Sequence, residues 1–333
     1  MNKKQLIDRW YVNQDLLKNV LKTISKHQDL EIGLDKINGR LDLRGAPLCS
    51  VEKEINVGNS EHQLTLNIGS LNVRSYNFND IDFSYAEMSS AVFKQCSFVN
   101  CLFDHTKARG IEFSDCDFAA CEFLNSDFSY AYMSTNIGSK AGSFINCNFF
   151  KVDLRESTFT FPLVEDCIFE DCKLLATNFD GSRMKNINFK GKVDSPWFNG
   201  FSTRADKSVL WVFNRIDPRE FPNEMINVDF SDAELIGAAF GHGIKLDNCI
   251  FPKDDDMYLY VHNIQTVYPK AIEIISKEWE SHDQRVALSM IEEFYFGKSK
   301  QDQKADFIDR HMLSEGKFSV KFFALLRKLN TQG

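Results

Sequence analysis

The sequence predicts an all-β solenoid core with a helical cap at its N-terminus and an α-helical module at its C-terminus. A large apolar residue recurs at every fifth position from Phe78 to Met133, and only Ala108 interrupts the series. A smaller side chain precedes most of these residues by two positions, as at Ala86 and Cys96. A period of five fits neither an α-helix nor a β-strand. Short fixed periods are typical of solenoids, whose units bury an apolar face only by stacking.

The same period returns in two further stretches. It resumes after a one-residue slip near Gly138, and it reappears between Phe230 and Phe251. The apolar residues at these positions form the predicted core ladder: Phe78, Phe83, Phe93, Phe98, Phe103, Phe113, Phe118, Phe123, Phe128, Phe144, Phe149, Leu154, Phe159, Phe169, Leu174, Phe179, Phe189, Phe230, Leu235 and Phe240. The chain contains 30 Phe, yet no apolar run approaches the roughly 18 residues of a membrane span. We therefore expect a Phe-rich interior and no membrane association.

The repeated unit, small–(Asp/Asn)–(Leu/Phe)–x–x, resembles that of the pentapeptide-repeat family. Units centred on Phe118, Phe123 and Phe128 carry the match, which is dense from Leu64 to Phe189 and returns from Val228 to Phe251. The resemblance implies a right-handed quadrilateral β-helix with four five-residue sides per coil and the Phe/Leu and small positions inside. Rings one coil apart would stack at the strand spacing of about 4.8 Å. Because the family hosts unrelated functions, the resemblance predicts the fold rather than the activity.

The interruptions of the period divide the chain into five segments. We expect an N-terminal helical cap at 1–37, the first part of the β-helix at 38–189, an inserted aromatic loop at 190–225, the last coils at 226–252 and a C-terminal helical module at 253–333. An open solenoid end exposes unpaired strand edges, so both ends are expected to be covered.

Apolar residues of the first segment recur at helical spacing: Leu6, Trp10, Leu17, Leu21 and Ile24. We expect the helix to break near Asn13. Leu43 and Leu48, five positions apart, indicate a first degenerate pair of repeats. The charged start has no apolar core and no cleavage site of a secretory signal, which favours a cytoplasmic protein.

Eight of the nine cysteines occupy the small inward position, and Cys49 is the exception. Free Cys behaves as a small buried hydrophobe, and the spacing does not fit a zinc site. Cys96 and Cys116 lie one coil apart, as do Cys147 and Cys167, so oxidation of stacked pairs is an alternative. We expect reduced thiols, in keeping with a cytoplasmic location, and no metal or other cofactor.

The segment 190–225 is a long interruption of a regular solenoid, and such loops are usually functional or disordered. It is rich in residue types that anchor interfaces. The candidate partner-binding residues are Trp197, Phe198, Phe201, Trp211 and Arg215. The alternative is that residues 209–213 form a strand that docks on the coil or completes it.

The C-terminal segment shows helical periodicity. We expect a helix to start at Pro269 and to place Ile272, Ile275 and Trp279 on one face, with a last helix around 320–329. This module either caps the coil, forms a small independent domain or mediates a homodimer.

Catalysis finds no support in the motifs. The seven His show no HExxH pairing, and no GxSxG, GxxxxGK[ST] or GxGxxG is present. Asp254, Asp255 and Asp256 lack the Gly and the spaced ligands of a calcium loop. We therefore expect a protein that is not an enzyme.

The middle of the chain is acidic and both ends are basic. The candidate acidic faces are Asp115, Asp117, Glu122 and Asp127, and Glu165, Asp166, Glu170 and Asp171. Members of the resembled family that act in quinolone resistance or self-protection mimic duplex DNA and occupy DNA gyrase or topoisomerase IV. Residues 64–189 carry 16 Asp/Glu against 10 Lys/Arg, a much lower charge density than the one per about 1.7 Å of duplex DNA.

Three functional hypotheses follow. The first is a binding scaffold that contacts a protein partner through the coil surface, the inserted loop and the helical tail. The second is a DNA mimic that modulates or protects a type II topoisomerase. The third is an effector or immunity-type protein whose active part is the tail. An acidic coil is not expected to bind nucleic acid directly.

Overall fold

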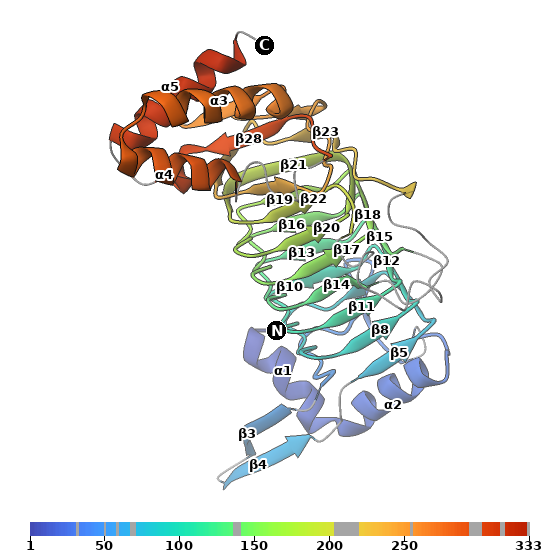
Figure 1. The fold of residues 1–333 in the computed structure, drawn as a ribbon. Helices are drawn as coiled ribbons and strands as arrows, with labels where there is room; N and C mark the ends of the chain where they lie inside the picture. The colour runs from blue at the N-terminus through green and yellow to red at the C-terminus, as the bar shows by residue number, and fades with distance from the viewer. Residues whose placement is uncertain are drawn as a thin grey trace, which may run out of the picture.

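The protein is an elongated stack of β-coils with helices at both ends (Figure 1). The computed structural model describes residues 1–30, 33–49, 51–57, 60–66, 71–135, 141–202, 220–253, 256–292, 302–313 and 317–331. For 51–57 and 60–66 it describes the backbone only. The stack is the predicted β-helix, because equivalent residues of successive coils pair as parallel strands.

Each coil has four sides, which we number in chain order from Phe78. Side 1 contains β6 (Asn77–Asn79), β9 (Ser97–Val99), β12 (Asp117–Ala119), β15 (Ser143–Ile145) and β18 (Leu163–Glu165). Side 2 contains β7 (Ile81–Asp82), β10 (Leu102–Asp104), β13 (Glu122–Leu124), β16 (Asn148–Phe150) and β19 (Ile168–Glu170). Side 3 is held mainly by single bridges, which join Pro47, Glu87, Lys107, Asp127, Asp153 and Lys173 in succession.

Side 4 is a parallel sheet whose register shifts within β14 (Tyr132–Thr135). Its strands are β5 (Asn72–Arg74), β8 (Val92–Lys94), β11 (Glu112–Ser114), β14, β17 (Thr158–Thr160), β20 (Asn178–Asp180), β22 (Trp197–Asn199) and β25 (Ala239–Gly241). Near the C-terminal end, β21 (Arg183–Asp194) runs continuously around sides 1 to 3. It pairs there with β23 (Ile226–Asp229) and β24 (Ala233–Ile236), and β26 (Cys249–Ile250) pairs with β23.

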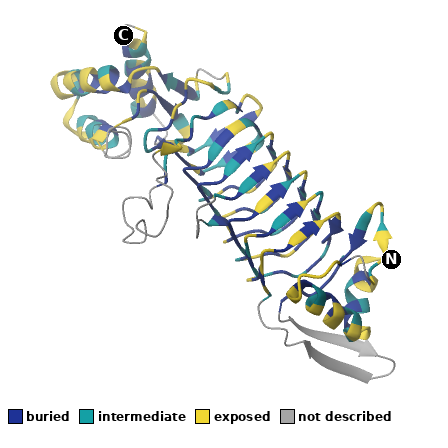
Figure 2. Ribbon diagram, turned by 90° about the vertical axis from the view of Figure 1, so that its right-hand side faces the viewer, coloured by how far each residue is buried: buried dark blue, intermediate teal, exposed yellow. Residues whose placement is uncertain are grey.

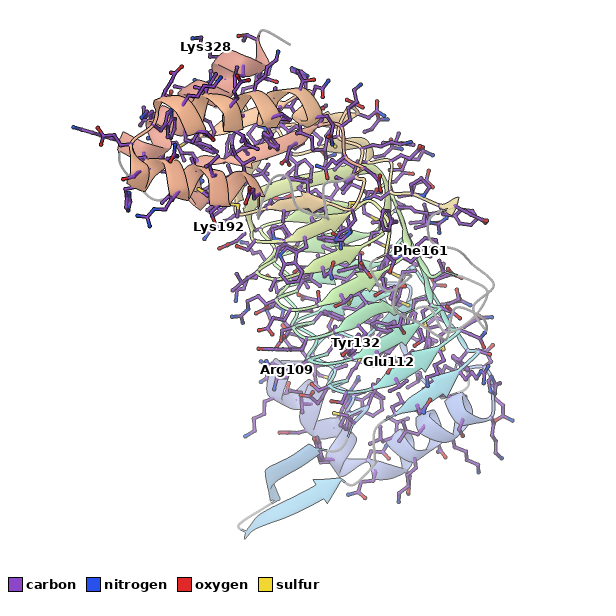
Figure 3. The ribbon with its side chains drawn as sticks, in the orientation of Figure 1. Arg109, Glu112, Tyr132, Phe161, Lys192 and Lys328 are labelled. Atoms are coloured by element: carbon purple, nitrogen blue, oxygen red, sulfur yellow. The ribbon has the colours of Figure 1, made fainter. Side chains whose placement is uncertain are left out.

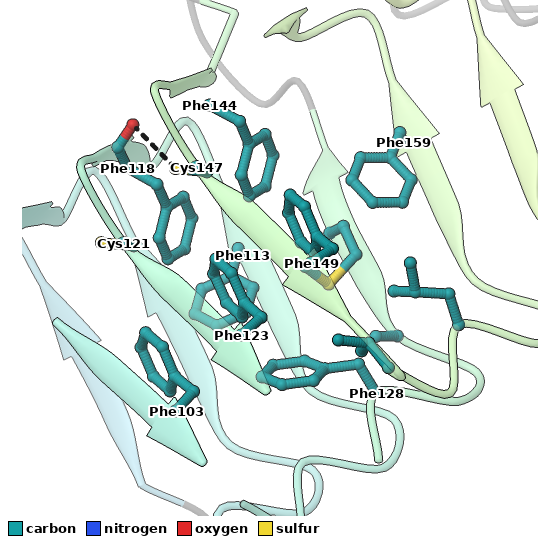
Figure 4. Packing of buried hydrophobic residues seen from close by; sticks show 14 of the residues in the cluster. Phe103, Phe113, Phe118, Cys121, Phe123, Phe128, Phe144, Cys147, Phe149 and Phe159 are labelled. Carbon is teal, nitrogen blue, oxygen red and sulfur yellow. Dashed lines mark hydrogen bonds between the residues drawn. The ribbon is translucent and has the colours of Figure 1, made fainter. Parts of the chain in front are cut away.

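The interior is a ladder of Phe rings. Phe118 stacks between Phe98 and Phe144, with ring centroids 4.7 Å apart on both sides, and Phe123 stacks on Phe149 at 4.6 Å (Figure 4). Rings from adjacent sides meet edge to face, as Phe113 does with Phe118 at 4.9 Å. Each such pair adds about 0.5–1.5 kcal/mol beyond the burial of its area.

Left-handed turns explain the period of five. A short strand is followed by a residue with positive φ, such as Asp80 (φ 51°) or Asn100 (φ 52°), and the chain then enters the next side. Asn and Asp tolerate this conformation. They also bond along the stack, since Asn100 Nδ2 donates to Asp80 Oδ1 at 2.6 Å and Asn186 Nδ2 to Asp166 Oδ1 at 2.8 Å.

The slip near Gly138 is larger than one residue in the stack. Phe144 lies over Phe118, so this coil advances 26 positions where others advance 20. One extra residue lies within β14, where the register shifts, and the others follow β14 in a stretch that includes 136–140, outside the described residues. The six added residues equal one whole repeat unit plus one residue. A count in steps of five therefore detects only a slip of one residue and misses the added unit.

The N-terminal cap contains α1 (Lys3–Val12) and α2 (Gln14–Ser25), and Asn13 ends the first helix and begins the second, as expected. β1 (Lys36–Ile37) and β2 (Arg40–Asp42) form the start of an incomplete coil under β7. Trp10 is fully buried, and its Nε1 donates to the carbonyl oxygen of Arg44 at 2.8 Å. Arg9 Nη1 donates to Asp42 Oδ2 at 2.6 Å, and Arg44 Nε to Asp42 Oδ1 at 2.9 Å.

The repeat register does not extend back to Leu64, contrary to expectation. β3 (Val51–Val57) and β4 (Ser60–Leu66) form an antiparallel hairpin, which projects from the N-terminal end (Figure 1), and Leu64 pairs with Lys53. The coil register begins at Val73, which pairs with Phe93. The reason is visible in the sequence, where apolar residues alternate with period two, the pattern of a hairpin rather than of a coil.

The interruption expected at 190–225 begins later. β21 continues to Asp194, and β22 extends side 4, so the chain up to Asn199 belongs to the coils. Residues 203–219 lie outside the described residues, and with them the strand expected at 209–213. The period seemed to end at Phe189 because the following side is one residue shorter, with Phe198 over Phe179.

The C-terminal module covers the last coil and has a core of its own. It contains β27 (Tyr258–Val261), β28 (Asp306–Asp309), α3 (Ile264–Glu278), α4 (Ser281–Met290), the 3₁₀ helix η6 (Arg310–Met312) and α5 (Lys317–Asn330). Phe307 stacks on Phe251 at 4.4 Å, and Asp309 Oδ2 accepts from the Gly237 amide at 2.7 Å. A second cluster, including Tyr268, Ile275 and Phe322, joins the helices to one another.

Two expectations for this module need correction. α3 begins at Ile264, so Pro269 lies inside the helix instead of at its start. The missing amide costs one intrahelical hydrogen bond, which the buried face formed by Val267, Tyr268 and Ala271 offsets. The antiparallel pair β27–β28 was not anticipated, because its two strands are far apart in the sequence.

Candidate functional site

Side 4 carries a column of outward residues that is poor in charge. Glu112, Tyr132, Thr158, Asn178 and Trp197 are register partners in succession. Each stands at the start of its strand, next to the buried central residue, so its side chain points away from the Phe ladder. Figure 3 shows Glu112 and Tyr132 on the front of this sheet. Only Glu112 in this column bears a charge.

Four large apolar side chains of this region are exposed, and we call them the apolar strip: Tyr130, Tyr132, Leu175 and Trp197, at 42%, 45%, 48% and 50%. Tyr130 occupies the left-handed turn between sides 3 and 4 (φ 59°), and Leu175 immediately precedes the equivalent turn at Ala176 (φ 57°). Tyr132 and Trp197 are three rungs apart, about 14 Å at the usual strand spacing. The strip therefore follows one edge of side 4.

Arg109 holds the ring of Tyr130 in place. Its guanidinium carbon lies 4.1 Å from the ring centroid, and its Nη1 donates to Ser129 Oγ at 3.4 Å. Cation–π contacts at exposed sites are worth about 0.5–1 kcal/mol. One end of the strip is thus ordered before any partner arrives.

Side 3, which borders the strip, is charged but balanced. Glu87, Lys107, Asp127, Asp153 and Lys173 form one column, with Lys107 bound to Glu87 at 3.7 Å and Lys173 to Asp153 at 3.5 Å. Burial works to raise the pKa of Asp153, but hydrogen bonds from Arg155 and the nearby positive charges outweigh it and hold this pKa below its usual value. Asp153 is therefore ionised at neutral pH and paired with Arg155 and Lys173.

The structure does not gather the first predicted acidic set on one face. Asp115 lies buried at the turn before side 1, Asp117 is on side 1, Glu122 on side 2 and Asp127 on side 3. The physical reason is that five residues advance the chain by one side, so acids clustered in sequence encircle the coil. Glu122 also accepts a hydrogen bond from Arg40 at 2.7 Å.

The second acidic set is distributed in the same way. Glu165 is on side 1 and pairs with Lys185, while Glu170 is on side 2, level with Lys190. Asp166 and Asp171 occupy left-handed turns. No continuous acidic face forms from these residues.

The five candidate residues of the aromatic loop have different environments. Trp197 is exposed and belongs to the apolar strip. Phe198 is fully buried between Phe179 and Phe240, so its assignment to a partner surface is wrong, because it is the core residue of its rung. Phe201 is half-buried against His242. Trp211 and Arg215 lie outside the described residues.

The family model for pentapeptide repeats matches residues 96–134 as eight copies. These residues form the regular coils that contain Phe98, Phe118 and Phe128. Residues 96–134 of this chain are pentapeptide repeats. A comparison with curated proteins gave no match.

Solved structures with a similar fold include two pentapeptide-repeat examples of low identity. HetL, involved in heterocyst differentiation regulation in the cyanobacterium Nostoc sp. strain PCC 7120, is 10% identical, with a TM-score of 0.28 over 56% of this chain and 92% of HetL. QnrB1, a plasmid-mediated fluoroquinolone resistance protein, is 13% identical in its full-length structure, with a TM-score of 0.24 over 53% of this chain and 81% of QnrB1.

Three members of the apolar strip were not among the residues predicted from the sequence. Tyr130, Tyr132 and Leu175 lie within the repeats and not in the interruption of the period. The signal was present, since large apolar side chains at outward positions of the repeat have no interior to fill. Assigning all five positions of each unit to inside or outside would have found them.

Other chemistry is sparse in the parts of the chain that the structure describes. No group of three His, Cys, Asp or Glu is placed to hold a metal ion among those residues. A cavity of about 360 Å³ lies under β6, lined by residues that include His27, Asp29, Tyr76 and Asp80. No described helix has the length and apolar character to cross a membrane.

Four thiols form one column inside the coil. Cys101, Cys121, Cys147 and Cys167 follow one another on side 2, and Cys121 Sγ donates to the carbonyl oxygen of Phe98 at 3.3 Å. Cys172, on the next side, donates in the same way to the carbonyl oxygen of Phe149. Burial raises the pKa of Cys172 to about 12. These thiols are free and buried.

Proposed function

We propose that this protein is a non-enzymatic binding scaffold that contacts a protein partner through the apolar strip of side 4. The observation that carries the proposal is the exposure of Tyr132 and Trp197 on a parallel sheet, at 45% and 50%. Large apolar side chains on a soluble surface mark interaction sites when they gather in a patch. Trp and Tyr are also the residues most enriched among those that dominate binding energy.

The architecture supports this role in two ways. Each strip residue is borne by a rung whose central residue, such as Met133 or Phe198, is buried, so little ordering is needed on binding. The column between Tyr132 and Trp197 contains only Thr158 and Asn178, which offer hydrogen bonds without a charge to desolvate. A partner surface with an apolar centre fits this edge, and its rim would meet Arg155 and Glu156 on the rung between Tyr130 and Leu175.

The test is affinity capture from the source cell with matched variants. We expect Trp197→Ala and Tyr132→Ala to weaken capture of a partner about tenfold, while the melting temperature stays within about 3 °C. Ile145→Ala, which changes an apolar residue of side 1 that is 38% exposed, is the control and should leave capture unchanged. Equal capture by all four proteins would refute the proposal.

A type II topoisomerase is the named alternative partner. The mimicry of DNA would need stacked acids, yet Asp117 has Ser97 and Ser143 as neighbours along its column, and Glu122 has Leu102 and Asn148. We therefore propose that any topoisomerase contact uses the apolar strip. An assay of DNA gyrase supercoiling at increasing salt concentration distinguishes binding through the apolar strip from mimicry of DNA. Inhibition by charge mimicry would fall steeply as the salt concentration rises.

The C-terminal module is proposed to act as the cap of the coil and, through its helices, as the contact of a homodimer. Val320 on α5 is 53% exposed beside Lys321. Val320→Glu should shift the mass measured by light scattering from dimer to monomer. A monomeric mass for the wild-type protein at tens of micromolar would contradict the proposed homodimer.

A further inference from the structure

Arg183 lies against two aromatic rings at the corner where side 4 turns into side 1. It is the first residue of β21, an outward position level with Leu163. Its guanidinium carbon lies 5.0 Å from the ring centroid of Phe161 and 5.7 Å from that of Phe221. The two rings are nearly perpendicular, with centroids 6.2 Å apart. Figure 3 shows Phe161 on the flank of the stack, away from Arg109.

Among the described residues, no carboxylate lies within ion-pair distance of this guanidinium. Nε is buried without a hydrogen-bond partner, whereas the two Nη atoms are not buried. Glu224, one rung further along the stack, pairs with Lys245, and Glu165 pairs with Lys185. Burial, with no opposing charge, lowers the pKa of Arg183. A half-buried cation without a counter-ion is costly, so its retention requires a reason.

Phe161 adds an independent observation. It is buried and has φ 62°, a conformation that is unusual for a bulky residue. The equivalent turns of other coils hold Ser75, Gln95, Asp115 and Gly181. The turn is left-handed at this corner in those coils as well, and in this coil the residue that occupies it places an aromatic ring beside the guanidinium.

We propose that Arg183 is a carboxylate-binding site, which receives an Asp or Glu side chain of a protein partner. The two rings hold the guanidinium at this corner, and no ion pair with a described carboxylate occupies it. A planar guanidinium is the group that binds a carboxylate in bidentate fashion. One positive charge matches one carboxylate, while a phosphate monoester or nucleic acid would bring excess negative charge to an acidic coil. This site is separate from the apolar strip, and it stands or falls independently of the proposed function.

The direct test follows the Nε–Hε resonance of Arg183 in the ¹⁵N-labelled full-length protein, assigned by its loss in Arg183→Lys. Sodium acetate is titrated against sodium chloride at equal ionic strength. We expect a saturable shift with acetate and a dissociation constant on the order of tens of millimolar. The same unsaturable drift with both salts would overturn the proposal. At least fivefold tighter binding of inorganic phosphate would overturn the carboxylate assignment.

Three variants test the geometry. Phe221→Ala, at a ring that is 43% exposed, should weaken acetate binding at least threefold with an unchanged melting temperature. Arg155→Gln is the matched control, since Arg155 is already bound to Asp153 at 2.6 Å. Glu224→Gln should also leave binding unchanged. If Phe221→Ala has no effect, or if Glu224→Gln tightens acetate binding, the aromatic clamp is not a site for an external carboxylate and the proposal fails.

Discussion

At the scale of residues, stability and function are assigned to different positions of the same five-residue unit. The central residue is buried in the ladder, and the residue before it faces solvent, as Phe198 and Trp197 illustrate with 0% and 50% exposure. Figure 2 shows this alternation along the coils. Substitutions at the two positions should therefore affect different measurements.

Phe118→Ala should lower the free energy of unfolding by about 3–5 kcal/mol, as expected for a large buried ring. The ring contacts Phe98, Phe144 and Phe113 at 4.7 to 4.9 Å, so its loss leaves a cavity bounded by three others. Urea denaturation measures the effect. Val99→Ala, at a residue that is 38% exposed, should cost less than about 1 kcal/mol. Equal losses for the two variants would contradict the ladder.

The buried thiols should be unreactive in the native protein. Thiolate is the nucleophile, and burial raises the pKa of Cys172 to about 12, so at pH 8 this thiol stays protonated. We expect iodoacetamide to leave the column thiols unmodified at pH 8, because they are buried inside the coil, and to modify all nine cysteines after unfolding in guanidinium chloride. Mass spectrometry counts the adducts. Rapid native alkylation of Cys121 or Cys147 would show that the coil opens.

At the scale of elements, the N-terminal and C-terminal caps stabilise the two ends of the coil. Burial alone would raise the pKa of Asp42, but hydrogen bonds from Arg44 and Arg9 outweigh it and hold the pKa well below its usual value. A carboxyl whose folded pKa is depressed stabilises the protein above its unfolded pKa, near 3.8. That contribution is lost progressively as the pH falls below this value toward the folded pKa.

Asp42→Asn should therefore destabilise the protein at pH 7 by about 3 kcal/mol, because two arginines lose their partner. The gap between variant and wild type should narrow at pH 3, where the wild type has begun to lose the same contribution. Urea unfolding at the two pH values measures this. If the difference in unfolding free energy between variant and wild type is the same at both pH values, the ion pair of Asp42 is not its cause.

Truncation after Pro252 should expose the last coil. Phe251 and Phe240 would lose the contact with Phe307, at 4.4 and 6.0 Å, and the strand edges would be uncovered. We expect aggregation in size-exclusion chromatography. If the truncated protein is soluble with its calculated mass, the module is an independent domain and not a cap.

The caps and coils also show how far sequence reasoning reaches. The core ladder and the helix break at Asn13 could be predicted, because both depend on local periodicity and capping. The pairing of β27 with β28 could not, since it joins strands more than forty residues apart. The prediction of two acidic faces was wrong for a geometric reason. Acidic residues that are close in sequence lie on different sides of the coil, and two residues share a face only when they are a whole coil apart.

At the scale of the whole molecule, the described coils form an elongated stack with the apolar strip and Arg183 on different edges. Rungs of parallel strands hold Tyr132 and Trp197 in register along side 4, and the folded state needs neither side chain for its core. Repeat proteins use such extended surfaces to bind. The central claim is that side 4, rather than the acidic positions or the helical module, meets the partner.

Site-specific photo-crosslinking measures this most directly. A benzophenone amino acid is placed at Trp197, and in a second protein at Ile145, a control on side 1 with 38% exposure. We expect one discrete adduct from position 197 in extracts of the source cell, and its disappearance when Tyr132→Ala is added. An adduct of equal yield from position 145, or none from position 197 while a partner is still captured, would contradict the account.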